Sequence, residues 1–93
     1  MPSGVYMSAN NIIWIEMNLN PKIPPNTECT MIIENVSSDK ALHAGVRTKG
    51  SSLNRRRIIL PKTSIQMKVK TDIKSKIETY SENRDKIIFR VKI

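Results

Sequence analysis

The chain has 93 residues, which is enough for one small domain and leaves no room for a second hydrophobic core. Lys and Arg total 16 and Asp and Glu total 8, so the formal net charge is +8 and favours anionic partners. A single cysteine, Cys29, excludes an intrachain disulfide, and together with a single histidine, His43, it excludes a zinc site formed within the chain.

The first residues differ in composition from the rest. Residues 1–10 are small and polar, which predicts a flexible N-terminal arm, and residues 11–93 are predicted to form a single β-sandwich domain. Apolar and polar residues alternate from Ile13 to Leu19, which is typical of a strand with one buried face. The prolines that follow cannot donate hydrogen bonds to a sheet, so 20–27 is predicted to be a connection.

Three more strand patterns follow before the long central segment. They cover residues 27–36, 42–48 and 58–60, and turn-forming residues separate them. Their apolar positions are mostly Ile and Val, and β-branched side chains pack well on pleated strands. In the first of the three, we expect Cys29, Met31 and Ile33 to share the buried face.

The clearest alternation runs from Ile65 to Thr79. On one continuous strand, successive side chains point to opposite faces, so we expect one apolar face and one exposed face. The exposed face would carry four lysines at strand spacing, namely Lys68, Lys70, Lys74 and Lys76. Part of the same segment, 72–80, also fits helical spacing, so a short helix there is the open alternative.

A last strand is predicted over 87–93, after turn-forming residues at 81–85. The chain then has about six strands joined by short turn-rich links. This organisation predicts an all-β sandwich or barrel.

Catalytic chemistry is not indicated by these residues. No carboxylate pair lies near His43, and no glycine-rich or oxyanion-forming signal accompanies Cys29, so neither has the partners that a base or a nucleophile needs. The three glycines do not form a phosphate-binding pattern. We therefore expect no enzyme, no catalytic residue, no cofactor and no metal.

Two basic clusters are candidates for anion binding. Guanidinium groups bind phosphates and carboxylates through paired hydrogen bonds, and three consecutive arginines cannot all face inward from a strand. Alternate lysines on a strand lie about 7 Å apart, which suits contact with successive phosphates. The nucleic-acid hypothesis therefore uses Arg55, Arg56, Arg57, Lys68, Lys70, Lys74 and Lys76. In the alternative interpretation these charges only keep an edge strand solvated and discourage aggregation.

The chain also resembles a known family. Residues 35–48, from Asn35 through Ser-Ser-Asp to Arg47-Thr48, resemble the segment of major sperm protein (MSP) domains in which a strand ends in Asn, turns through Ser or Thr and leads into a strand ending in Lys/Arg-Thr. Residues 58–69 resemble the later I-I-x-P-x-x-S-I-x-V-x-V strand of that family. The resemblance covers roughly residues 12–93.

This resemblance implies a seven-stranded immunoglobulin-like β-sandwich of the MSP or PapD-like type, without enzymatic activity. Sperm members of the family dimerise and polymerise into a motility cytoskeleton, and VAMP-associated members bind acidic peptides through a basic face. Carried over by position, the residues that would bind an acidic partner are Arg47, Thr48, Lys49 and Lys86. The leading hypothesis is thus a protein–protein interaction or assembly module, and the alternative is a basic nucleic-acid-binding β protein such as a viral one.

The sequence departs from the family pattern at one sheet edge. The sequence given stops at Ile93, where the family continues into a seventh strand, and a missing edge strand leaves backbone groups unpaired. Either the N-terminal arm covers that edge or another chain does, and the second case predicts a homo-oligomer or a strand-adding partner.

The hydropathy pattern gives an expectation for localisation. No apolar run approaches the ~20 residues of a membrane span, and residues 1–11 lack the features of a secretory signal. With one cysteine only, a reducing environment is expected. We therefore expect a cytoplasmic protein.

Overall fold

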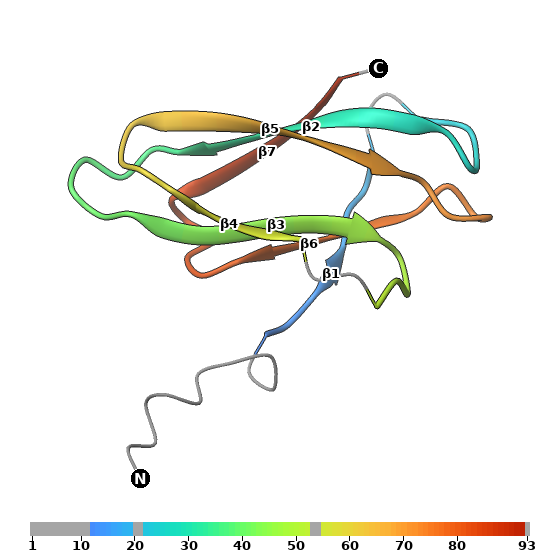
Figure 1. The fold of residues 1–93 in the computed structure, drawn as a ribbon, viewed down its shortest axis with the longest axis horizontal. Helices are drawn as coiled ribbons and strands as arrows, with labels where there is room; N and C mark the ends of the chain where they lie inside the picture. The colour runs from blue at the N-terminus through green and yellow to red at the C-terminus, as the bar shows by residue number, and fades with distance from the viewer. Residues whose placement is uncertain (1–11, 20–21, 53–54, 93) are drawn as a thin grey trace, which may run out of the picture.

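The computed structural model describes residues 12–19, 22–52 and 55–92 (Figure 1). These residues form β-strands and no helix, so the chain has no helix there that could cross a membrane. The strands are β1 (Ile15–Glu16), β2 (Glu28–Asn35), β3 (Leu42–Thr48), β4 (Arg56–Ile59), β5 (Thr63–Lys70), β6 (Ile77–Ser81) and β7 (Ile87–Lys92). The all-β prediction is confirmed, while the predicted arm, 1–10, lies outside the described residues.

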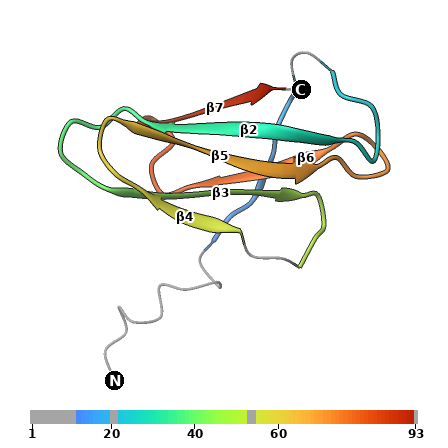
Figure 2. The ribbon, with the colours of Figure 1, turned by 45° about the horizontal axis from the view of Figure 1, so that its top comes forward.

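The seven strands form two antiparallel sheets that pack face to face as a sandwich (Figures 1 and 2). One sheet has the order β1-β6-β3-β4 and the other has the order β5-β2-β7. The pairs β2–β5 and β3–β6 match the B–E and C–F pairs of an immunoglobulin-like sandwich. The terminal strands differ, because β7 crosses over to pair with β2 and β1 takes the edge beside β6.

The edge that was predicted to need cover, from the N-terminal arm or from another chain, is partly covered by β1 of the chain itself. Ile15 and Glu16 of β1 pair with Thr79 and Glu78 of β6, and the N–H of Met17 donates to the next carbonyl of β6. The strand predicted from Ile13 to Leu19 shrinks to these two residues because β6 is short and the chain then leaves its edge.

The prediction of one continuous strand from Ile65 to Thr79 is wrong. It is broken at residues 71–76, where the chain turns from β5 in one sheet to β6 in the other. The Asp72 carboxylate accepts the N–H groups of Lys74 at 2.9 Å and Lys76 at 2.7 Å, which is a local bond pattern that competes with a strand. The prediction that four lysines share one exposed strand face is consequently wrong, and so is the alternative prediction of a helix over 72–80.

Thr71 fixes the start of this turn against a distant part of the chain. Its side chain is fully buried, donates to the carbonyl of Pro24 at 2.6 Å and accepts the N–H of Thr27 at 2.9 Å. Thr71 occupies an inward position in the alternating pattern, and its hydroxyl is held there by hydrogen bonds to the connection at 24–27.

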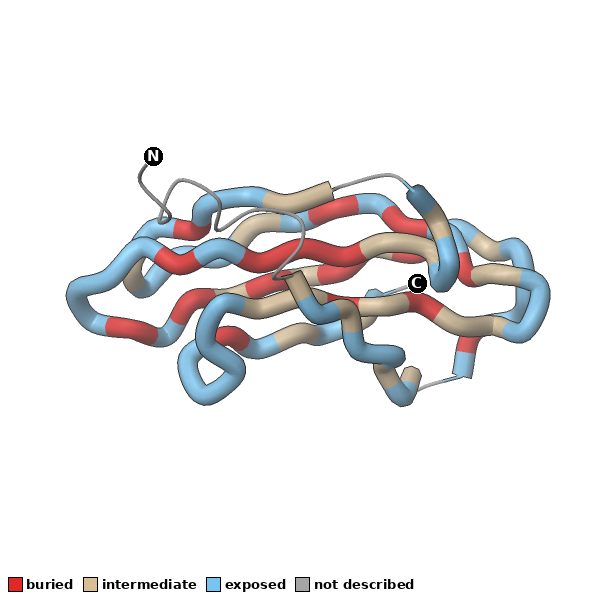
Figure 3. Tube along the Cα trace, turned by 90° about the horizontal axis from the view of Figure 1, so that it is seen from below, coloured by how far each residue is buried: buried red, intermediate tan, exposed pale blue. Residues whose placement is uncertain are grey.

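The core lies between the sheets, where the alternation of each strand directs its apolar side chains (Figure 3). Cys29, Met31 and Ile33 of β2 are buried as expected, opposite apolar residues of β3, β4 and β6. Burial raises the pKa of the Cys29 thiol, with a smaller contribution from Glu28, so this cysteine stays protonated.

Candidate functional site

The residues expected to bind an acidic partner do not gather at one place. Arg47 and Thr48 end β3 and Lys49 follows them, whereas Lys86 precedes β7. The turn before β7 lies at the opposite end of the sandwich, since Glu82 donates its N–H to the carbonyl of His43 near the start of β3. A strand of this length spans about 20 Å, so Lys86 is remote from the other three residues.

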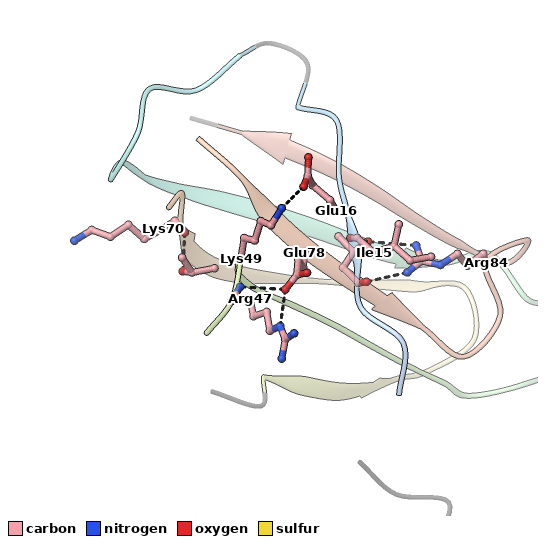
Figure 4. A network of polar contacts seen from close by, with 10 residues as sticks. Ile15, Glu16, Arg47, Lys49, Lys70, Glu78 and Arg84 are labelled. Atoms are coloured by element: carbon pink, nitrogen blue, oxygen red, sulfur yellow. Dashed lines mark hydrogen bonds and ion pairs between the residues drawn. The ribbon is translucent and has the colours of Figure 1, made fainter. Parts of the chain in front are cut away.

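The charge of Arg47 is already engaged within the protein (Figure 4). Its Nε donates to Glu78 Oε1 at 2.9 Å, and the two side chains are only 21% and 15% exposed. Its guanidinium lies 4.3 Å from the centre of the Trp14 ring, a cation–π arrangement. Thr48 donates to the carbonyl of Lys70 at 2.7 Å and so connects the two sheets. Arg47 and Thr48 therefore have structural roles.

Glu16 of β1 binds two lysines from other elements. Its carboxylate contacts Lys49 Nζ at 2.6 Å (Figure 4) and Lys76 Nζ at 3.2 Å, and these hydrogen bonds lower the pKa of Glu16. The same contact raises the pKa of Lys49. Lys49 and Lys76, each predicted to bind an external anion, thus share one carboxylate, whose single negative charge offsets only one of their two positive charges. The sequence pattern did not single out Glu16.

Acidification is expected to loosen β1. A carboxyl group whose pKa is lowered in the folded state stabilises that state at any pH above its ordinary pKa of about 4.3. This stabilisation is lost as the pH falls through the lower pKa that the group has in the folded state. Emission of Trp14, the only tryptophan, reports on the position of β1, so it should shift to longer wavelength at acid pH while the circular dichroism of the strands persists.

Glu16→Gln should show the shifted emission already at neutral pH and should lose the acid transition. Glu28→Gln removes an exposed carboxylate of the other sheet and is the matched control. An unchanged emission spectrum in Glu16→Gln would mean that the two lysine contacts do not hold β1.

A second basic region is assembled by the fold. The arginines at 55–57 lie on or beside β4, and Lys68 and Lys70 are exposed on β5. These two strands are the edges of their sheets on the same side of the sandwich (Figure 2). Arg55 Nη1 donates to the carbonyl of Lys68 and connects them. Five of the seven residues in the nucleic-acid hypothesis are therefore brought together.

The same region continues across the outer face of the β5-β2-β7 sheet. Lys68 of β5 and Lys92 of β7 both pair with Thr30 of β2, so their strands lie about 10 Å apart with a neutral residue between them. Arg90 lies on the same face of β7, two residues before Lys92. We call this region the basic surface, and it comprises Arg55, Arg56, Arg57, Lys68, Lys70, Arg90 and Lys92.

Most charges of the basic surface have no acidic partner. Of the seven residues of the basic surface, only Arg90 forms an ion pair with a described residue, Glu34, at 3.4 Å. Sequence reasoning missed Arg90 and Lys92. Their outward positions follow from the alternation of 87–93, but their place beside Lys68 depends on β7 pairing with β2, which no local pattern indicates.

Lys74 and Lys76 lie outside the basic surface, in the turn between β5 and β6. His43 is exposed, and its Nδ1 lies 3.4 Å from Glu82 Oε1. Within the described parts of the chain, no group of three or more His, Cys, Asp or Glu side chains could hold a metal ion.

A scan of protein-family models, a search of curated proteins and a search of solved structures each found no match to this chain. The resemblance to MSP domains therefore remains a prediction.

Proposed function

We propose that this protein is a non-enzymatic binding module that holds the phosphate backbone of nucleic acid on its basic surface. One observation carries the proposal: seven cations lie along the β4 edge and across the outer face of the β5-β2-β7 sheet, and six of them have no carboxylate partner among the described residues. Such an arrangement gives an electrostatic attraction that a polyanion can satisfy along its length.

Binding of this kind is largely independent of base sequence. Arginine forks and lysine ammonium groups contact phosphates, which position the ligand but carry little sequence information. Stacking on aromatic rings is not provided by this surface, because Trp14 and Tyr80 lie against each other on the other sheet with ring centres 6.0 Å apart.

The test is a salt titration of binding to fluorescein-labelled oligouridylate, followed by anisotropy. For a single strand the log–log slope is about 0.7 per phosphate contact, so contacts by all seven cations would give a slope of about −5. Changing Arg55, Arg56 and Arg57 together to Ser should weaken binding at least about tenfold in low salt and reduce the slope by about 2 units.

The control removes the same charge from elsewhere. Lys40, Lys62 and Lys86 lie in exposed connections at the end of the sandwich where β5 and β7 begin, whereas Lys68, Lys70 and Lys92 lie toward the other ends of those strands, so their change to Ser should leave the slope almost unaltered. Equal losses in both triple variants, or no loss in the arginine variant, would rule out the basic surface as the nucleic-acid site.

A protein-interaction role is the second candidate, and the open edge of β7 favours it. β7 pairs with β2 on one side only, and Ile88 on this strand is 41% exposed. An acidic peptide strand, or a second copy of the chain, could add to this edge. Polyglutamate that competes with oligouridylate at equal charge, or concentration-dependent dimers in sedimentation, would favour this candidate over the first.

A further inference from the structure

A groove away from the basic surface has both apolar and cationic walls. Three segments line it, namely residues 17–19 after β1, residues 22–24, and residues 74–76 of the turn before β6. Its volume is about 710 Å³, within the range of small-molecule sites. We propose that this groove binds a monomeric amphipathic anion, that is, an acyl or alkyl chain that ends in a carboxylate or sulfate.

The apolar part of the groove is continuous with the core. Ile23 is 2% exposed, and Met17 and Leu19 are half-buried side chains packed against the core cluster. An alkyl chain lying on Met17 and Leu19 removes apolar surface from water on both partners, while Ile23 is already buried beneath them. Met17 is unbranched and polarisable, so it adapts to chains of different length.

The cationic part comes from three lysines. Lys22 and Lys74 are exposed and form no ion pair among the described residues, while Lys76 shares Glu16 with Lys49. The other nearby carboxylate, Asp72, is engaged by the backbone N–H groups of the turn. The groove therefore presents unpaired positive charge beside apolar surface, which complements an anionic head on an apolar tail.

The backbone of the turn argues against an added peptide strand as the occupant. The N–H groups of Lys74 and Lys76 donate to the Asp72 carboxylate, and that of Ser75 donates to the Asp72 carbonyl at 2.9 Å. A peptide strand needs free main-chain groups to pair with. An amphiphile needs only charge and apolar contact, and both are present.

The experiment is calorimetric titration of the full chain with sodium dodecanoate below its micelle concentration. We expect saturable one-to-one binding. Butyrate keeps the head without the tail, and dodecyltrimethylammonium keeps the tail with the opposite charge, so both should bind at least tenfold more weakly.

Lys22→Glu combined with Lys74→Glu should weaken dodecanoate binding at least tenfold. Lys40→Glu combined with Lys62→Glu makes the same change of net charge in exposed turns and should leave it within twofold. Leu19→Ser tests the apolar contact separately, and we expect a loss of about threefold to tenfold. Circular dichroism of each variant verifies the fold.

Several results would overturn the proposal. They are equal losses in the two lysine variants, equal binding of the cationic amphiphile, binding to phosphatidylglycerol vesicles without binding to dodecanoate, and binding of hexaglutamate in place of dodecanoate. Neither lysine variant alters the basic surface, so the affinity for oligouridylate should fall equally in both. The proposal for this groove and the proposal for the nucleic-acid site can therefore be rejected independently of each other.

Discussion

Asn35→Asp is expected to destabilise the fold by about 3 kcal/mol, because the buried carbonyl of Ile59 and the partly buried carbonyl of Lys40 both lose the Asn35 donor. Asn35 is 0% exposed at the end of β2. Its Nδ2 donates to the carbonyl of Lys40 at 2.7 Å and to that of Ile59 at 2.8 Å, and its Oδ1 accepts the N–H of Ser37 at 2.9 Å. One amide thus connects the β2–β3 turn to the last residue of β4.

Aspartate has nearly the same shape, so the substitution leaves no cavity; it removes the Nδ2 donor and adds a carboxylate in its place. It keeps the acceptor for Ser37 but places a second oxygen against two carbonyl oxygens in a buried site. Each unsatisfied buried polar group costs about 1–3 kcal/mol, and a buried carboxylate adds a desolvation cost. The free energy of unfolding from urea titration at neutral pH measures the sum.

The matched control is Asn83→Asp, because Asn83 is exposed and uses only its acceptor, for the N–H of Asp85 at 3.0 Å. This variant should stay within about 0.5 kcal/mol of the parent chain. Burial disfavours the ionised form of a carboxyl group, so the pKa of the introduced Asp should be raised and its cost should shrink as the pH falls. Equal stability of the two variants would show that the Asn35 amide does not hold the turn to β4.

The sequence predicted those elements whose pattern is local. The alternation over 27–36 and 42–48 corresponds to β2 and β3 within one residue at each end, and the turn after Asn35 was expected from its Ser and Asp residues. The break at residues 71–76 was missed because Thr71 and Ser75 continue the period of two. What ends β5 there is the hydrogen bond of Thr71 to Pro24, 47 residues away in sequence, together with the side-chain bonds of Asp72.

The candidate site was predictable only in part, for a similar reason. The arginines at 55–57 and the lysines of β5 were singled out by composition and alternation, and the fold brings them together. The pairing of Arg47 with Glu78 and of Lys49 with Glu16 joins residues more than 30 positions apart, so local patterns could not show that these two cations have acidic partners. Cross-strand neighbours depend on strand order, which a single sequence does not encode in any short segment.

Gly45→Ala is expected to cost about 2 kcal/mol and also to weaken binding of nucleic acid. Gly45 is buried in β3, opposite Arg56 of β4. A Cβ atom at this position would lie 2.4 Å from the carbonyl oxygen of Arg55 and 3.2 Å from its carbonyl carbon. Backbone atoms cannot rotate away, so β4 must shift, and overpacking of this kind costs about 1–3 kcal/mol.

The shift also disturbs the basic surface. The same carbonyl of Arg55 accepts the N–H of Val46 at 3.3 Å, and this bond holds the segment whose arginine side chains form one end of the surface. Urea titration measures the stability of Gly45→Ala, and anisotropy with labelled oligouridylate, at temperatures where the variant is folded, measures the site. We expect a loss of affinity of at least threefold in addition to the lower stability.

Gly50→Ala separates these two effects. A Cβ at Gly50 meets nothing within 4 Å, but its φ of +79° is unfavourable for alanine, which costs roughly 1–2 kcal/mol without moving Arg55. This variant should therefore lose stability and keep its affinity for oligouridylate. If both glycine variants lose affinity in proportion to stability, then the position of β4 does not determine binding, and the arginines at 55–57 act only through their net charge.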